Sequence, residues 1–101
     1  MKRVVKVEII TDALEVENII KLLEEVGVSG YSVIKDVTGK GHRGVRSGYA
    51  FSDLFKNSYI LVVGEENQMH KVVEAIKPII KKFGGLCIVS DVILRIHRGD
   101  D

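Results

Sequence analysis

The stretch Thr38–Phe51, TGKGHRGVRSGYAF, contains the densest cluster of residues that could bind a charged ligand. Its segment Gly39–Gly48 holds four glycines, three cationic side chains and a histidine within ten residues. Glycines allow successive backbone amides to converge on an anion, and the planar guanidinium groups of Arg43 and Arg46 match phosphate oxygens in pairs. The pattern predicts a phosphate-binding loop. The alternative is a solvated hairpin whose glycines serve chain geometry and whose charges keep a sheet edge soluble.

The glycine spacing also resembles a dinucleotide-binding fingerprint, because Gly39, Gly41 and Gly44 read G-x-G-x-x-G. That motif requires an amphipathic helix directly beneath the pyrophosphate and a parallel sheet beyond it. The residues that follow, VRSGYAFSDLFK, carry no helical stripe. We therefore do not expect a Rossmann site, and Lys40 lacks the glycine spacing of a Walker loop.

A second alternative comes from the GYAF segment, Gly48–Phe51, which resembles the centre of an RNP1 motif in RNA-recognition modules. RNP1 lies within a strand, whereas this segment precedes the apolar run of residues 58–64 and carries Ser52 and Asp53. An RNA-binding module of RRM-like topology is therefore the alternative function. If the segment does not bind RNA, Tyr49 and Phe51 form the tip of a loop that docks on a target, or they fold back on the sheet edge.

The remaining reactive residues do not form a site. His42, His70 and His97 are dispersed over different predicted elements, so no metal site is expected. No nucleophile, base and orienting group occur together in the sequence, so we expect that the protein is not an enzyme. Cys87 is the only cysteine; it excludes an internal disulfide and has the apolar neighbours of a core residue.

The composition indicates a soluble cytoplasmic protein without general affinity for nucleic acid. The chain has 101 residues, 46% of them apolar, and its 15 Lys and Arg against 14 Asp and Glu leave a net charge of +1. No apolar stretch approaches the roughly 20 residues that span a bilayer. Lys6 and Glu8 interrupt the run in which a signal peptide would be continuous.

Hydrophobic periodicity in the first half predicts a strand, a helix and a second strand. Arg3–Ile10 alternates apolar and polar residues and is β-branched. Asp12 is placed to cap the next segment together with Glu15, and Gly27 is placed to end that helix in a left-handed conformation. Helical spacing joins Val16, Ile19, Ile20, Leu23 and Val26. The second strand is expected over Tyr31–Val37.

The second half predicts a strand, a helix and a final strand. Ser58–Gly64 is almost continuously apolar and is expected to be covered on both faces. Asn67 is the predicted helix cap, and Pro78 predicts a kink or an early stop. The helical stripe consists of Met69, Val72, Val73, Ile76, Ile80 and Phe83. Gly84 and Gly85 should end the helix before a last strand over Leu86–His97.

This order, β-α-β-loop-β-α-β, is that of the α+β, ferredoxin-like βαββαβ fold, an antiparallel sheet with two helices on one face. We expect one domain over residues 1–101, with a loop at about 38–56 and a fraying tail at 98–101. Two helices shield only one sheet face. The other face would be too apolar for a monomer, so we expect self-association, cyclic in form.

The residues Ser29–Gly48, SGYSVIKDVTGKGHRGVRSG, resemble PII-like signalling proteins, closest to the SbtB-type regulators of bicarbonate transporters. Gly27–Val33, GVSGYSV, also matches that family's pattern. The resemblance implies a ferredoxin-like homotrimer that binds an adenine nucleotide (AMP, ADP, ATP or cAMP) in clefts between subunits. It also implies that a T-loop engages a target, a membrane transporter or an enzyme, which would bring a cytoplasmic protein to the inner membrane.

The resemblance also implies which residues bind the nucleotide. They are Val37, Thr38, Gly39, Lys40, Gly41, Arg43, Arg46, Gly84, Gly85 and Arg95. Leu86 stands where the family's loop before the last strand would carry a lysine, which implies weaker triphosphate binding. A purely structural oligomer, trimeric without any ligand, is a third possibility.

Overall fold

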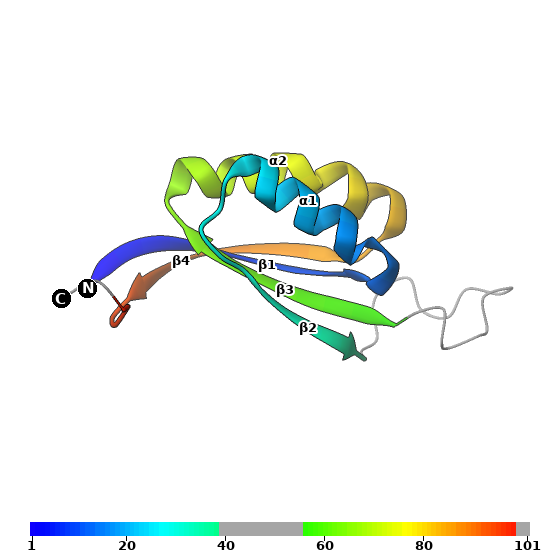
Figure 1. The fold of residues 1–101 in the computed structure, drawn as a ribbon, viewed down its shortest axis with the longest axis horizontal. Coiled ribbons are helices and arrows are strands. Elements are labelled where there is room, and N and C mark those ends of the chain that lie inside the picture. The colour runs from blue at the N-terminus through cyan, green and yellow to red at the C-terminus, as the bar shows by residue number, and fades with distance from the viewer. Residues whose placement is uncertain (39–55, 99–101) are drawn as a thin grey trace, which may run out of the picture.

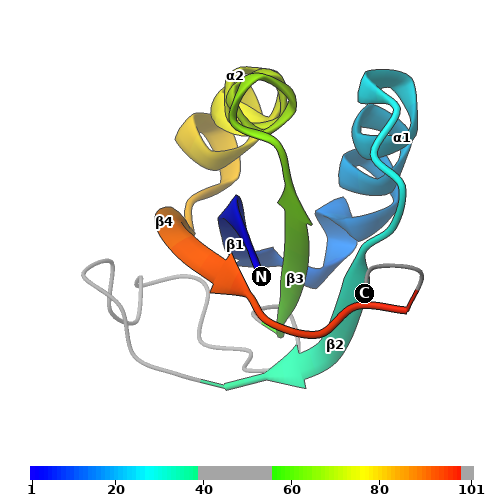
Figure 2. The same cartoon turned by 90° about the vertical axis from the view of Figure 1, so that its left-hand side faces the viewer.

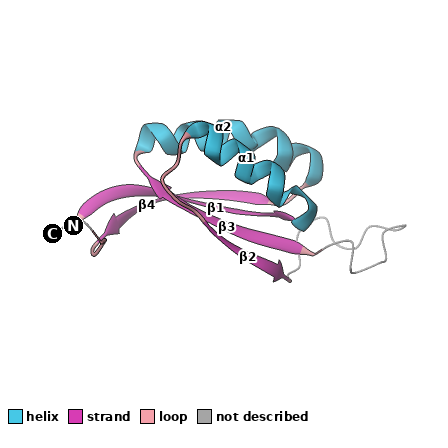
Figure 3. Ribbon diagram, viewed as in Figure 1, coloured by secondary structure: helices cyan, strands magenta, loops and turns pink. Residues whose placement is uncertain are grey.

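The computed structural model describes residues 1–38 and 56–98, which form one sheet covered by helices on one side. The elements are β1 (Lys2–Asp12), a short 3-10 helix (Ala13–Glu15), α1 (Val16–Val26), β2 (Ser32–Val37), β3 (Asn57–Gly64), α2 (Glu66–Phe83) and β4 (Leu86–Leu94). Figures 1 and 3 show α1 and α2 lying together above the sheet. The described residues thus confirm the predicted ferredoxin-like arrangement.

The sheet has the strand order β2-β3-β1-β4, so β1 and β3 are the inner strands. All three neighbouring pairs are antiparallel. Because side chains alternate between faces, Val5, Val7 and Ile9 of β1 point toward the helices. These residues are buried, whereas the residues between them point to the opposite face, which we call the open face.

The core lies between the sheet and the two helices. It is built from buried aliphatic side chains of β1, β3 and both helices. Its members are Val5, Val7, Ile9, Ile19, Leu23, Ile60, Val62, Met69, Val72 and Ile76. The helical stripes predicted from sequence supply the helix side of this core, although Phe83 at the end of α2 is exposed. Cys87 packs against the core from β4 and is half-buried.

The helix ends agree with the sequence in part. Asp12 is a cap, but of the 3-10 helix: its Oδ1 accepts from the Leu14 backbone N–H at 2.9 Å. Glu15 accepts a hydrogen bond from Asn18. Gly27 ends α1 with a left-handed φ of 91°, as predicted. Asn67 was the wrong cap, because α2 begins at Glu66 and Glu65 precedes it without a side-chain cap bond.

One predicted end is confirmed and two expectations differ. The helix α2 ends at Phe83, before Gly84 and Gly85 with positive φ, as predicted, but Pro78 does not stop it early. The exposed position of Pro78 explains this, since water can bond the carbonyl that the missing N–H leaves free. The last strand ends at Leu94 rather than at His97. Beyond it the chain crosses below the sheet toward β2 (Figure 2).

The open face carries several exposed apolar side chains. The prediction that residues 58–64 are covered on both faces fails for the described chain, because β3 alternates buried and half-buried residues. Ile34, Leu86 and Ile88 are 57%, 45% and 48% exposed. The strand register places all three on the open face. This face has the character of a surface that another chain covers.

Candidate functional site

The site predicted from sequence draws on the loop that follows β2, on the turn after α2 and on Arg95 after β4. Seven of its residues, Gly39, Lys40, Gly41, Arg43, Arg46, Tyr49 and Phe51, lie outside the described residues. The described members are Val37, Thr38, Gly84, Gly85 and Arg95. The structure shows where these five lie in the fold and which of them share one end of the sheet.

The strand β2 reaches the loop through an irregular turn of the backbone. Its pairing with β3 shifts between Ile34 and Val37, and Asp36 between them has a φ of 60°. A positive φ is uncommon for a residue other than glycine, although aspartate tolerates it better than most. After the shift Val37 pairs with Asn57. This bulge therefore sets the direction in which Thr38 leaves the sheet.

The other side of the loop base is held by hydrogen bonds to β1 and its 3-10 helix. The Ala13 backbone N–H donates to the Lys56 carbonyl at 2.8 Å. Thr11 Oγ1 donates to the Gly84 carbonyl at 2.9 Å, which holds the turn after α2 against β1. Lys56, Gly84 and Thr38 thus lie at one end of the sheet, which we call the loop-base end.

Gly84 and Gly85 lie at the opposite edge of this end from Val37. Val37 is on β2 and Gly85 directly precedes β4, and these two strands are the sheet edges. Three strand spacings separate them, roughly 14 Å. Arg95 is not at this end at all, because the nine residues of β4 separate it from Gly85, a length of roughly 30 Å.

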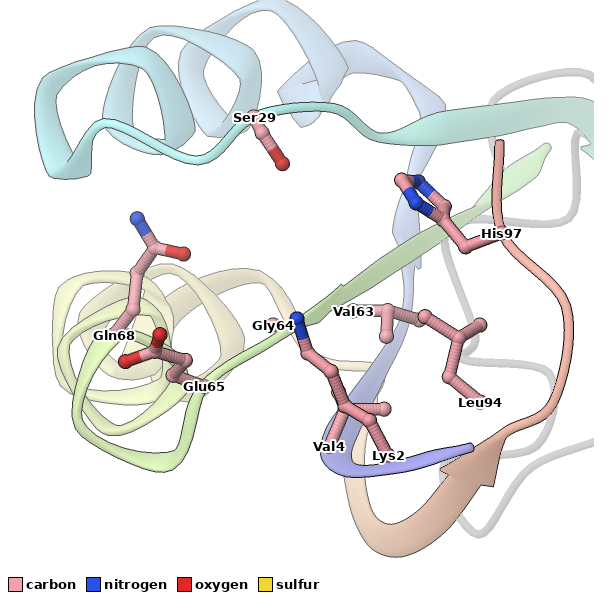
Figure 4. Close-up of a pocket in the computed structure, with 9 residues that line it drawn as sticks. All are labelled: Lys2, Val4, Ser29, Val63, Gly64, Glu65, Gln68, Leu94 and His97. Atoms are coloured by element: carbon pink, nitrogen blue, oxygen red, sulfur yellow. The ribbon is translucent and has the colours of Figure 1, made fainter. Parts of the chain in front are cut away.

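At the end of the sheet near Arg95 the structure has a pocket of about 480 Å³. Figure 4 shows its nine lining residues, Lys2, Val4, Ser29, Val63, Gly64, Glu65, Gln68, Leu94 and His97. Gln68 is held in place because its Nε2 donates to the Gly27 carbonyl at 2.9 Å. Sequence reasoning missed this pocket, since its residues come from separate segments of the chain and no local motif joins them.

The described residues hold little reactive chemistry. No group of three or more His, Cys, Asp or Glu side chains in residues 1–38 and 56–98 is placed to hold a metal ion. Burial raises the pKa of the Cys87 thiol, so it is protonated and a poor nucleophile at neutral pH. None of the described helices is long and apolar enough to cross a bilayer.

Comparison with known proteins places this chain in one family. Residues 4–99 match the family described as nitrogen regulatory protein P-II. The chain therefore belongs to the P-II family. A search of curated proteins found no match.

Solved structures agree with this assignment. One similar structure is CPII from Thiomonas intermedia K12 bound to ADP and bicarbonate, with a TM-score of 0.75 and 25% identity, covering 90% of this chain and 87% of that one. A PII-like signalling protein from Thermus thermophilus matches with a TM-score of 0.71 at 18% identity, over 89% and 87% of the two chains. The ATP complex of B. subtilis GlnK matches with a TM-score of 0.66 at 22% identity, over 89% and 82%. The last two support the fold alone.

Proposed function

We propose that this chain is a PII-like regulator, not an enzyme, that binds an adenine nucleotide between the subunits of a homotrimer. The nucleotide is AMP, ADP, ATP or cAMP, and its binding controls a target through the loop at about 38–56. A membrane transporter, such as a bicarbonate transporter of the kind that SbtB-type proteins regulate, is the proposed target. The protein acts from the cytoplasm and reaches the inner membrane only through that target.

The separation of the predicted nucleotide-binding residues carries this proposal. Gly84 and Gly85 lie at the loop-base end, whereas Arg95 follows β4 at the other end, roughly 30 Å away. One copy cannot bring these residues to a single nucleotide. Two copies can, if the loop-base end of one lies against the Arg95 end of the next.

Two further observations support a nucleotide at this boundary between two copies, which we call the seam. The pocket of about 480 Å³ is lined by Leu94 and His97, which lie on either side of Arg95 in the sequence, and it has the size of a small-molecule site. CPII, at 25% identity, binds ADP and bicarbonate. We propose that the pocket end of one copy and the loop-base end of its neighbour together enclose the ligand. The family match does not favour the RNA-binding alternative.

Calorimetry with the four nucleotides tests the assigned arginines. Each of Arg43→Ala, Arg46→Ala and Arg95→Ala removes a charge-assisted contact worth about 1.5–3 kcal/mol, so affinity should fall at least about tenfold. Lys21→Ala, an exposed residue of α1, is the control and should bind normally. Unchanged affinity in all three arginine variants would remove their role.

Mixed trimers test whether the site is shared between copies. In a trimer made only of Arg43→Ala chains, or only of Arg95→Ala chains, every site lacks one of the two arginines. Neither trimer should therefore bind the nucleotide tightly. When the two chains are refolded together, some seams join an intact Arg43 to an intact Arg95, and tight binding should reappear at those seams. A site within one copy would show no recovery, because every copy would still lack one arginine.

A further inference from the structure

The open face contains one cluster of polar side chains near the middle of the sheet. Tyr59 Oη donates to Glu8 Oε2 at 2.7 Å, and Lys6 Nζ lies 3.4 Å from Glu8 Oε1. Lys6 and Glu8 belong to β1 and Tyr59 belongs to β3, which are the two inner strands. The cluster therefore lies away from both sheet edges.

Apolar side chains flank the carboxylate of this cluster. The register places Leu61 and Ile88 on either side of Glu8, and Val63 and Ser90 on either side of Lys6. The side chains of Lys6 and Glu8 are 34% and 23% exposed, and Ile88 is 48% exposed. A chain that covers Leu61 and Ile88 also covers Glu8, which lies between them, and comes close to Lys6 on the same face.

Glu8 remains charged at neutral pH. The hydrogen bond from Tyr59 lowers the pKa of the Glu8 carboxyl below its ordinary value of 4.5, and Lys6 lowers it further against the opposing effect of burial. The same hydrogen bond raises the pKa of Tyr59 above 10.0, so the phenol keeps its proton. The covered cluster therefore contains a carboxylate and an ammonium group, and both need polar partners.

The hydrogen-bonding capacity of the cluster exceeds the contacts that its three side chains make with one another. An ammonium group has three donors and a carboxylate has about four acceptor positions. Lys6 and Glu8 make one contact with each other, and Tyr59 adds one more to Glu8. Because a cation and an anion stand side by side, the same patch on a second copy offers the complementary charge.

We propose that Lys6 and Glu8 form the recognition pair of self-association, with Lys6 of one copy bonding Glu8 of the next copy across their open faces. This inference rests on the trimer of the proposed function and adds how the copies recognise one another. The exposed apolar residues supply the area that association buries, but buried area alone allows two open faces to align in many ways. A charge pair favours the one alignment in which each charge meets its opposite on the other copy. Alignments that leave either charge buried without a partner are disfavoured.

Charge reversal and charge exchange test this pairing. Glu8→Lys places two cations in each patch and Lys6→Glu places two anions, so both should raise the concentration at which half the trimer dissociates by at least about tenfold. The exchanged double variant, Lys6→Glu with Glu8→Lys, restores one charge of each sign and should recover most of the assembly. Analytical ultracentrifugation over a concentration series measures all three. Glu8→Gln, checked by circular dichroism, is a milder variant if Glu8→Lys does not fold.

Matched reversals on α1, Lys21→Glu and Glu24→Lys, are the controls, because both residues are exposed on the helix layer. If the Lys6 and Glu8 variants assemble like these controls while the wild-type chain is trimeric, the recognition pair is wrong and the proposed function stands. Single variants that dissociate without recovery in the exchanged variant would also overturn the pairing. A monomeric wild-type chain would overturn the pairing and the shared nucleotide site together.

Discussion

Gly85 occupies a position where any side chain would meet the backbone of β1. A Cβ built there would overlap the Ile10 carbonyl oxygen and lie 2.9 Å from the Thr11 Cα. Its φ of 105° is also one that other residues rarely adopt. Gly85 is therefore required by the close approach of two chain segments, apart from any contact with a ligand.

Replacing this glycine should destabilise the fold strongly. Gly85→Ala forces the turn away from β1, and we expect it to lower the free energy of unfolding by about 3 kcal/mol or more. Gly27→Ala, at a φ of 91° with nothing within 4 Å, should cost only about 1 kcal/mol. Gly30→Ala, in open space, should be near neutral. Urea unfolding measures the series, and equal losses at residues 27 and 85 would contradict the steric explanation.

The residue scale also shows where sequence reasoning ends. The pair Gly84–Gly85 could be predicted to end a helix, because glycine is a frequent helix terminator. Its contact with Ile10 and Thr11 could not, since these residues lie more than seventy positions earlier and only the folded sheet brings them together. Arg95 could be assigned from resemblance, but its distance from Gly85 became clear only from the course of β4.

At the scale of elements, α2 tolerates a proline in its interior. The helix continues for five residues beyond Pro78, to Phe83. Pro78 and Glu74, whose carbonyl loses its helical partner, are both exposed. The buried face of the helix, which carries Met69, Val72 and Ile76, is left intact. Sequence predicted the local defect, but which side of the helix faces the core decided its effect.

Removing the proline should strengthen α2. Pro78→Ala restores the N–H donor to the Glu74 carbonyl and removes the ring, so we expect a gain of about 1–3 kcal/mol in the free energy of unfolding. The gain is limited because alanine also frees the unfolded chain. Chemical denaturation compares this variant with Lys77→Ala, an exposed neighbour expected to change stability by at most about 0.5 kcal/mol. A loss of stability in Pro78→Ala would show that the proline fits the helix without cost.

The order and type of the elements could be predicted because the spacing of apolar residues differs clearly between the strands and the helices. The alternation in β1 and the helical stripe of α1 both point to the same core. The bulge before Val37 could not be predicted, since no glycine marks it and Asp36 adopts the positive φ instead. The predicted cap at Asn67 failed because a polar residue close to a helix start resembles a cap even when it lies inside the helix.

At the scale of the whole molecule, the two faces of the sheet are covered unequally. The helices bury the inner strands on the first face, although Val89 and Ile93 of the edge strand β4 stay exposed there, whereas Ile34, Leu86 and Ile88 remain exposed on the second face. Two ends of the molecule carry different parts of the proposed ligand site. Both features are those expected of a subunit whose stability and function are completed by other copies.

Thermal stability should therefore depend on protein concentration. Association of folded copies stabilises the folded state by mass action, so the midpoint of thermal unfolding should rise as the chain is concentrated. Differential scanning calorimetry over about a hundredfold range of concentration measures this. Adding the preferred nucleotide should raise the midpoint again. A midpoint that is constant over that range would argue that each copy unfolds independently.

The two lateral edges of the sheet are not equally protected against fibre growth. The bulge and the left-handed Asp36 interrupt the row of backbone groups along β2, which makes that edge a poor template for an added strand. β4 is nine residues long and pairs with β1 without a register shift, and Asp91 is its only charged residue. Any uncontrolled stacking of copies into cross-β fibres should therefore start along β4.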